Sequence, residues 1–319
     1  MNAFSRGPTR RALGRRALVA AGLMVTLTIL FLCQIADQPV TLLLLGSDTR
    51  DPQEPGRSDT IIVLHADPAA REVRGLTLPR DLYVSLHGLD RPLTNRLNAA
   101  LFFGDYFNVS GGGLHAARET VQHHLGIPMN GTFLVRFGAV EDVVDSLGGV
   151  EIYFEHPVTD RSFHPLKAGR SYALRFESGW NYLDGSRALE FIRLRRPDTD
   201  FGRMGRNRKL LEALVAQVRG PGGTWRVTRL LPTLFGVLRS DLGLLEKVRV
   251  AWVFYRCAER PISWRSLAPD EVEPCVTAQG AQVLLPDPEL LKDLGQWLHV
   301  GTATDVAGLR KDADPASRL

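Results

Sequence analysis

Three short apolar runs in the first third of the chain each lie directly beside an arginine and an aspartate. The runs cover residues 40–46, 60–66 and 73–79, and the charged stretches next to them read SDTR, RSDT and PRD. Nearly continuous runs of Leu, Ile and Val are typical of strands that are covered on both faces. The pattern therefore predicts a buried sheet whose strand ends carry paired opposite charges.

Helical patterns alternate with further strands along the rest of the chain. Leu114, Ala117, Val121 and Leu125 form one apolar stripe that Gly126 closes, which predicts a helix. The other predicted elements are a strand at 132–137, a helix at 137–147, a strand at 150–154, a helix at 184–190 running into a strand at 191–195, a helix at 203–218, and two helices with a strand pair within 225–300. This alternation predicts a single α/β domain with a central mixed sheet and helices on both of its faces.

The amino terminus predicts a membrane anchor. Residues 17–36 carry no charge and would span about 30 Å as a helix, which is the thickness of the hydrocarbon core. Five arginines precede this run, so we expect residues 1–16 to be a cytoplasmic basic tail and the rest to lie outside. A cleaved signal peptide is the alternative, but no small-x-small cleavage site follows the run.

The expected organisation is therefore that of a single-pass protein of the cytoplasmic membrane. A signal anchor at 17–36 precedes an extracytoplasmic domain at 40–300, and a polar tail at 301–319 follows it. Cys257 and Cys275 would then face an oxidising compartment, and we expect a disulfide between them rather than two free thiols.

The charged residues beside the strands form the candidate site. Asp48, Arg50, Arg57, Asp59, Arg80 and Asp81 all lie at the ends of the predicted strands or in the loop between them. Ligands of open α/β sheets bind beyond the strand ends, where loops converge. In the predicted strand 191–195, alternation would place Arg193 and Arg195 on one face, about 7 Å apart, with Ile192 and Leu194 on the other. Arg203, Arg206 and Asn207 share a helix face by their spacing.

Cations and carboxylates together indicate a metal-bridged polyphosphate. Mg²⁺ is bound in proteins by one or two carboxylates plus phosphate oxygens, and guanidinium groups bind the remaining oxygens in bidentate fashion. Structural salt bridges explain any single Arg–Asp pair equally well, but a set drawn from five chain segments favours a ligand site.

At these residues the sequence closely resembles the LytR-CpsA-Psr family of membrane-anchored glycopolymer transferases. The matching stretches, which lie in family order between about residues 40 and 300, are LLLLGSDTR, GRSDTIIVLHADP, LTLPRDLYV, RLNAA, VRFGAVEDVVDSLGGVEI, LDGSRALEFIRLR and DFGRMGRNRKLL. The resemblance implies a phosphotransferase that moves a glycosyl phosphate from a polyprenyl-pyrophosphate-linked glycan to a hydroxyl of peptidoglycan or another envelope acceptor. Polyprenyl phosphate would be released, and part of the apolar interior would surround the polyprenyl chain.

The resemblance also implies roles for individual residues. Asp48 and Asp59 resemble the carboxylates that hold Mg²⁺ (or Mn²⁺), and Asp81 resembles either an orienting group for Arg80 or a base. The residues that resemble a pyrophosphate clamp, or extend it, are Arg50, Arg57, Arg80, Arg96, Arg193, Arg195, Arg203, Arg206 and Asn207. Two of them depart from the family pattern, because Asn207 stands where glutamine is usual and Arg96 where lysine is common.

The same residues are also consistent with two other functional hypotheses. Water as the acceptor would make the protein a lipid pyrophosphate hydrolase, and binding without turnover would make it a regulator of envelope assembly. A nucleic-acid partner is not expected, because the arginines sit with carboxylates at strand ends rather than in a basic stripe. The sequence contains no Walker A loop, no G-x-G-x-x-G and no H-E-x-x-H.

Overall fold

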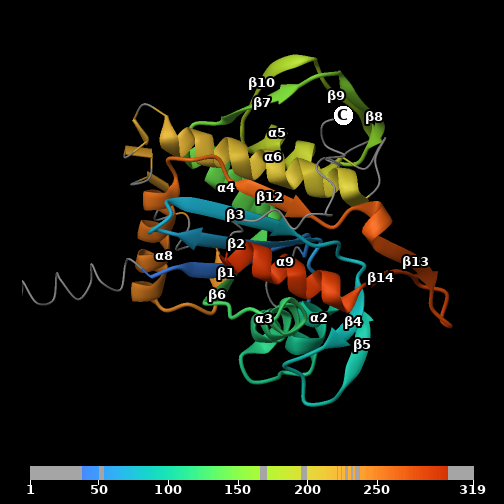
Figure 1. Ribbon diagram of the computed structural model, residues 1–319. Helices are drawn as coiled ribbons and strands as arrows, with labels where there is room; N and C mark the ends of the chain where they lie inside the picture. Colours follow the sequence, from blue (N-terminus) through green and yellow to red (C-terminus); the bar gives the residue numbers. More distant parts are fainter. Residues whose placement is uncertain are drawn as a thin grey trace, which may run out of the picture.

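The three apolar runs form adjacent strands of one six-stranded sheet in the computed structural model of the chain (Figure 1). The structure describes residues 38–49, 54–165, 171–194, 200–220 and 238–300, with residues 222, 223, 225, 226, 229, 230 and 233. The sheet has the order β11-β6-β1-β2-β3-β12. These strands are β1 (Val40–Ser47), β2 (Thr60–Asp67), β3 (Glu72–Thr77), β6 (Gly131–Arg136), β11 (Arg239–Ser240) and β12 (Ser263–Ser266).

Strand directions in this sheet are mixed, as predicted. β1 pairs antiparallel with β2, and β2 pairs antiparallel with β3. β6 runs parallel to β1, and β12 runs parallel to β3. The carboxyl ends of β1 and β3 and the amino end of β2 therefore meet at one edge of the sheet.

Helices cover both faces of the sheet. In Figure 1, α2 (Ala99–Tyr106) and α3 (Gly112–Leu125) lie below the sheet, and α9 (Pro288–Val300) crosses in front of it. Above it lie α4 (Phe137–Ser146), α5 (Gly185–Arg193) and α6 (Asp200–Arg219), and α8 (Leu244–Cys257) lies at its left end.

The pleat of β1 divides its side chains between two environments. Leu43 and Leu45 are buried in the core that includes α2 and α3. On the opposite face, Val40 and Leu42 pack with residues of α8, while Leu44 lines a cavity beneath α4 and α6. The face of β1 that carries Val40, Leu42 and Leu44 thus has α8 at its amino end and the cavity at its carboxyl end.

Two-stranded ribbons complete the domain. β7 (Val150–Phe154) pairs with β10 (Gly179–Leu183), and β8 (Val158–Phe163) pairs with β9 (Tyr172–Phe176). Both ribbons share a second core with α4, α5 and α6. Two further ribbons, joined by a bridge between Leu82 and Leu284, are β4 (Tyr83–Leu86) with β5 (Leu93–Arg96), and β13 (Val272–Val276) with β14 (Gln282–Pro286).

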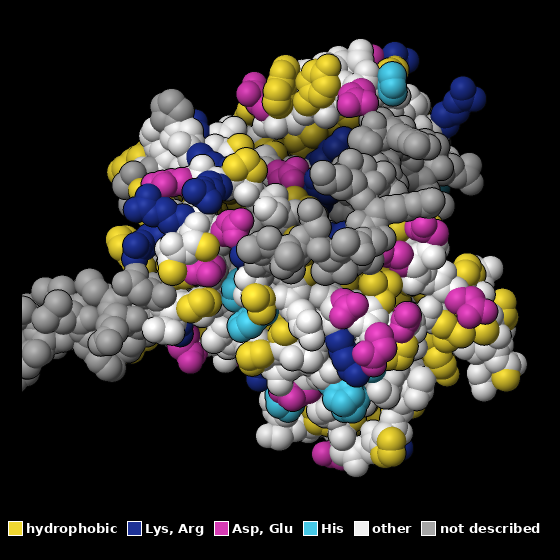
Figure 2. All heavy atoms as spheres, viewed as in Figure 1, with side chains coloured by type: hydrophobic (Ala, Val, Ile, Leu, Met, Phe, Trp, Pro, Cys, Tyr) yellow, Lys and Arg dark blue, Asp and Glu magenta, His cyan; other side chains and the backbone are white. Residues whose placement is uncertain are grey.

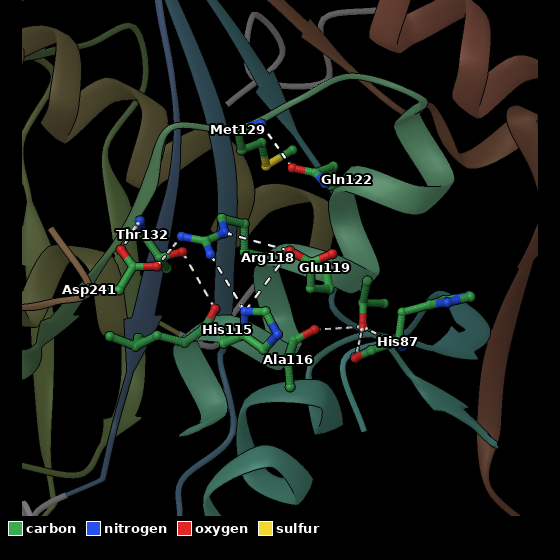
Figure 3. A network of polar contacts seen from close by, with 11 residues as sticks. His87, His115, Ala116, Arg118, Glu119, Gln122, Met129, Thr132 and Asp241 are labelled. Atoms are coloured by element: carbon green, nitrogen blue, oxygen red, sulfur yellow. Dashed lines mark hydrogen bonds and ion pairs between the residues drawn. The ribbon is translucent and has the colours of Figure 1, made fainter. Parts of the chain in front are cut away.

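An ion pair ties α3 to the sheet, as Figure 3 shows. Arg118 of α3 forms a hydrogen-bonded ion pair with Asp241, which follows β11. The other carboxylate oxygen of Asp241 accepts a hydrogen bond of 2.7 Å from the backbone N–H of Thr132 in β6. This network lies away from the charged strand ends described below.

The predicted strand at 191–195 is wrong, because α5 continues to Arg193. Asp184 caps the helix by accepting a hydrogen bond of 2.8 Å from the N–H of Arg187. Phe191 and Ile192 are buried in the second core, so the helical face is well packed through its last turn. The expected strand alternation of Arg193 therefore does not exist.

The predicted disulfide is also wrong, since Cys257 and Cys275 are both free. Cys257 ends α8 and is buried against the sheet with Val40 and Ala66, whereas Cys275 is exposed on β13. Among the helices that the structure describes, none has the length and apolar character needed to cross a bilayer. The predicted tail at 1–16, anchor at 17–36 and tail at 301–319 lie outside the described residues.

Candidate active site

The antiparallel pairing of β1 and β2 places the two predicted metal carboxylates at one edge of the sheet. Asp48 follows the last residue of β1, and Asp59 immediately precedes β2. The register sets Gly46 opposite Thr60, and the N–H of Asp59 donates to the carbonyl of Gly46 at 2.7 Å. β2 thus contributes its amino end to the site, not its carboxyl end.

Arg80 links this edge to a chain of alternating charges. Its guanidinium donates a hydrogen bond to Oδ1 of Asp59 and lies 3.5 Å from Oδ2 of Asp81. Asp81 in turn lies 3.3 Å from Nε of Arg96 on β5, whose Nη2 donates to the carbonyl of Gln282 at 2.6 Å. Every member is partly buried, so the four side chains hold one another in position.

The segment after β1 places Gly56 against the side chains of Ser47 and Thr49. The hydroxyls of Ser47 and Thr49 lie 2.8 Å apart, and the N–H of Thr49 also donates to Ser47. A Cβ atom on Gly56 would lie only 1.8 Å from the Thr49 hydroxyl oxygen, so this position accepts no larger residue without rearrangement. Arg57 follows this turn and is exposed, with its guanidinium 6.0 Å from the centre of the Phe102 ring.

A cavity of about 380 Å³ opens beside these charges, between the sheet and helices α4, α5 and α6. Its interior is lined by aliphatic side chains from both layers. Those of the sheet and of the segment before β11 are Leu44, Leu45, Ile62, Val135 and Leu238, and those of the helices are Val140, Val143, Ile192, Leu210, Leu211 and Leu214. The helix at 137–147 therefore lines a hollow, whereas the helix at 114–125 packs in the core.

Polar and charged residues of four chain segments line the same cavity. They are Asp48, Asp59, Thr60, Arg193, Arg203 and Asn207. Asn207 donates a hydrogen bond of 2.6 Å from Nδ2 to the hydroxyl of Thr60, which joins α6 to the start of β2. One hollow thus combines an aliphatic interior with both anionic and cationic groups.

Aromatic rings and a backbone carbonyl hold Arg193 in this lining. Its guanidinium carbon lies 5.6 Å from the centre of the Phe137 ring and 5.3 Å from that of Phe163. Its Nη2 donates to the carbonyl of His164 at 3.2 Å. Such stacking orients a guanidinium while leaving its edge able to bind an anion.

The structure separates the remaining predicted residues by location. Arg206 is buried and donates to the carbonyl of Leu194, so it binds the end of α5 instead of sharing the cavity with Arg203. Arg96 reaches the site only through Asp81. Arg50 and Arg195 lie outside the described residues.

Sequence reasoning missed two residues that shape the cavity. Thr60 was predicted only as the first residue of a strand, although its hydroxyl next to Asp59 in the sequence could have indicated a polar residue of the site. Phe137 gave no such signal, because an aromatic residue at a helix start is usually core.

The donor set fits a magnesium ion that is completed by a ligand. Asp48 and Asp59 supply the hard oxygen atoms that Mg²⁺ prefers. Throughout the described ranges, no group of three or more His, Cys, Asp or Glu side chains is arranged to hold a metal ion. Two carboxylates on one hollow suit an ion whose other ligands are phosphate oxygens and water.

Comparison with known proteins places the chain in a family. A model of the LytR_cpsA_psr family matches residues 26–273. A "polyisoprenyl-teichoic acid–peptidoglycan teichoic acid transferase TagU" of Enterococcus faecalis is 29% identical over 225 residues, which are 69% of this chain and 67% of that protein. The protein of the same name from Halalkalibacterium halodurans is 30% identical over 212 residues, which are 66% of this chain and 63% of that protein.

A solved structure agrees at the level of the fold. The crystal structure of B. subtilis TagV superposes with a TM-score of 0.66 at 23% identity and covers 83% of this chain and 99% of that one. The family match extends over most of the domain described above, including the strands and helices that form the cavity. The chain therefore belongs to the LytR-CpsA-Psr family.

Proposed function

We propose that the protein is a membrane-anchored phosphotransferase that acts outside the cytoplasm. It moves a glycosyl phosphate from a polyprenyl-pyrophosphate-linked glycan to a peptidoglycan hydroxyl and releases polyprenyl phosphate. The observation that carries this proposal is the cavity, in which an aliphatic interior adjoins two carboxylates, two arginines and an amide. The printed names of the relatives, which are polyisoprenyl-teichoic acid–peptidoglycan teichoic acid transferases, support the same classes of donor and acceptor.

The aliphatic part of the cavity suits the polyprenyl chain. Leu211 and Leu214 of α6 face Leu44 and Ile62 of the sheet across this space. Burying a prenyl chain there removes apolar surface from water, which contributes about 25 cal/mol per Å². The tail therefore supplies binding energy, and the charged residues of the cavity are left to act on the pyrophosphate.

Arg193 and Arg203 suit the two phosphates of the donor. Charge-assisted hydrogen bonds from a guanidinium contribute about 1.5–3 kcal/mol each, and Arg193 is already oriented by Phe137 and Phe163. Arg80 adds a further cation beside Asp59. Asp81 contacts both Arg80 and Arg96, so we assign it the orienting role and not that of a base.

Asp48 and Asp59 are the proposed ligands of Mg²⁺ (or Mn²⁺). When bound, such an ion supplies charge stabilisation to the phosphate oxygens. The position of Asp59 is fixed both by its backbone bond to Gly46 and by Arg80, so its carboxylate is held ready at the cavity.

The proposed reaction is an in-line displacement. The acceptor hydroxyl oxygen forms a bond to the sugar-proximal phosphorus and passes its proton to water, while the bond from that phosphorus to the bridging oxygen breaks. The electron pair stays with the bridging oxygen, so polyprenyl phosphate leaves as an anion. Arg193 and Arg203 stabilise the charge that develops on the phosphate oxygens during this step.

Turnover by the full chain tests this function. The protein would be reconstituted in vesicles with a lipid pyrophosphate that carries a radiolabelled glycan, and with peptidoglycan as the acceptor. We expect label in insoluble peptidoglycan and an equal amount of polyprenyl phosphate. Release of soluble glycan phosphate with or without peptidoglycan would instead identify a hydrolase, and tight binding without any product would identify a non-catalytic regulator.

Topology is tested separately in intact spheroplasts. Protease added to intact spheroplasts should degrade residues 40–300 while an amino-terminal tag ahead of residue 17 survives. Full protection of the domain would contradict the extracytoplasmic location, whatever its chemistry.

A further inference from the structure

Helix α8 presents an apolar face to solvent. Leu245 is 82% exposed and Trp252 is 50% exposed, although each is a large apolar residue. These two residues, with Leu244, Val248 and Tyr255, lie on one side of the helix by their spacing, and all five are exposed. We call these five residues the outer face of α8.

The outer face is distinct from the side that packs on the sheet. Val250, Val253 and Cys257 on the inner side are buried with Val40 and Ala66. A surface helix ordinarily has one apolar stripe and a polar opposite side. α8 has a second apolar stripe, and its five residues form a surface that the described part of the domain does not cover. An exposed apolar surface of this kind is characteristic of an interaction site.

The position of α8 indicates what lies against it. Nη2 of Arg249 donates to the carbonyl of Gln38 at 3.4 Å, so the helix lies beside the point where the chain enters the domain. Only one residue separates Gln38 from β1, and the uncharged run of residues 17–36 ends just before it. If that run crosses the membrane, the outer face of α8 is held within a few residues of the bilayer surface.

Cations surround the outer face. α8 carries Lys247, Arg249 and Arg256 but one acidic residue, Glu246. Beside Tyr255, a hollow of about 520 Å³ is lined by Arg71, Arg219 and Arg256 together with Glu259. Figure 2 shows basic, hydrophobic and some acidic side chains together at the left of the molecule, where α8 lies. Aromatic and aliphatic residues bordered by arginine and lysine are characteristic of helices that lie in a membrane interface.

We propose that the outer face of α8 rests on the lipid bilayer, with its cations against anionic headgroups. This inference rests on the proposed membrane anchor and not on the transfer chemistry. The ribbon β7–β10 also exposes aromatic residues, among them Trp180. It is bordered by Glu151, Glu155 and the ion pair of Glu177 with Arg175, so its border is net acidic and would be repelled by anionic lipid. Charge and position therefore both select α8.

Contact through α8 would fix the orientation of the whole domain. Along one face of β1, Val40 and Leu42 pack on α8, Leu44 lines the cavity, and Asp48 follows the end of the strand. The bilayer would lie at the amino end of β1 and the charged edge of the sheet at the other. The two contacts with lipid, one through the anchor and one through α8, would stop the domain from rotating freely about its tether.

Spin labelling of the full chain in vesicles tests the contact. A nitroxide would be placed through Val248→Cys in a background with Cys33→Ser and Cys275→Ser, leaving the buried Cys257. In vesicles of phosphatidylcholine and phosphatidylglycerol at about 3:1, we expect collisions with a water-soluble nickel complex to be several-fold rarer than for a label at Trp180→Cys. The depth from oxygen and nickel collisions should be about 5–10 Å below the headgroup level.

Even if the labelled protein misfolds, the contact is tested by a second measurement, on the chain without cysteine substitutions or spin labels. Brominated lipids should quench part of its tryptophan fluorescence, and Trp252→Phe should abolish most of this quenching while Trp180→Phe leaves it intact. Equal nickel accessibility at positions 248 and 180, with quenching indifferent to Trp252, would overturn the proposal. Dipolar broadening between labels at position 248 that disappears on dilution with unlabelled protein would overturn it in favour of a second copy of the chain. A depth that is the same in pure phosphatidylcholine would refute the part assigned to the cations.

Discussion

Replacing Asp59 by asparagine should separate the chemistry of the site from the stability of the fold. The carboxylate of Asp59 is 20% exposed and Arg80 is 29% exposed, so their ion pair is screened by water on one side. An ion pair of this kind contributes about 1 kcal/mol or less to stability. Arg80 also keeps Asp81 as a second partner at 3.5 Å, so no cation is left buried without a counter-charge. We therefore expect the melting temperature of Asp59→Asn to fall by no more than about 2–4 °C.

Turnover should respond much more strongly than stability. Asp59→Asn removes one of the two carboxylates at the cavity and also releases Arg80 from its fixed position. Loss of one charge-stabilising group in an active site typically lowers kcat by about 10²-fold or more, which is about 2.7 kcal/mol. The assay would be the transfer of radiolabelled glycan to peptidoglycan, measured over a range of Mg²⁺ concentrations at a temperature well below unfolding.

The ion pair of Asp241 with Arg118 provides a matched control, because its members are 18% and 21% exposed (Figure 3). Asp241 also accepts the N–H of Thr132, so Asp241→Asn should cost at least as much stability as Asp59→Asn. It lies outside the cavity lining and should leave turnover and its metal dependence unchanged. The reasoning would be refuted if the two variants lost turnover equally, or if Asp59→Asn kept wild-type turnover and metal dependence.

Three further changes probe other parts of the structure. Leu211→Trp should fill the aliphatic part of the cavity and weaken binding of a short-chain polyprenyl pyrophosphate in detergent by about 5–150-fold, which corresponds to overpacking of about 1–3 kcal/mol. Wild-type affinity in a calorimetric titration would show that the tail does not bind in this cavity. Arg193→Lys keeps the charge but loses the planar fork, so the same titration should show a loss of about 1–3 kcal/mol, whereas Arg175→Lys on β9, exposed and outside the cavity lining, should bind normally; equal affinities would take Arg193 out of the phosphate site. Burial, followed by the nearby His299 and Arg74, lowers the pKa of His65 to about 4, so the folded protein binds fewer protons than the unfolded chain between about pH 4 and 6.5. The stability that depends on neutral His65 should be fully present above pH 6.5, and the free energy of unfolding should fall by up to about 3 kcal/mol as the pH drops to 4. In urea titrations at different pH values, His65→Gln should lack this part of the pH dependence.

The strands of the main sheet were predictable because their physical cause is local. A run such as residues 60–66, apolar on both faces, has few alternatives to a buried strand, and β2 occupies almost that range. The convergence of Asp48, Asp59 and Arg80 also followed from their positions at strand ends. The antiparallel pairing of β1 with β2, which makes β2 contribute its amino end, is a long-range property that the runs do not encode.

The segment around Arg193 was predicted wrongly because two periodicities overlap there. Over five residues, alternation of Ile192 and Leu194 with arginines resembles a strand, but it equally fits the last turn of a helix and the residue after it. The packing of Phe191 on Phe154 and Phe176 favours the helix, and those are contacts with residues distant in the sequence. Arg206 illustrates the same limit. Helical spacing predicts the face of α6 from which its side chain projects, but the position of its guanidinium is set by the hydrogen bond to the carbonyl of Leu194.

The length of β1 has a consequence for how the protein would bind the proposed polyprenyl donor. The strand has eight residues, so the chain's entry point and the charged edge of the sheet are separated by about 23 Å along its axis. Under the proposed function and the proposed α8 contact, the polyprenyl donor would have to be drawn out of the bilayer by up to that distance before its pyrophosphate could reach Asp48 and Asp59. The length of β1 would therefore set the minimum length of the polyprenyl chain. In vesicles, donors whose polyprenyl chain is shorter than this distance should be poor substrates, although the same donors dispersed in detergent should still enter the cavity.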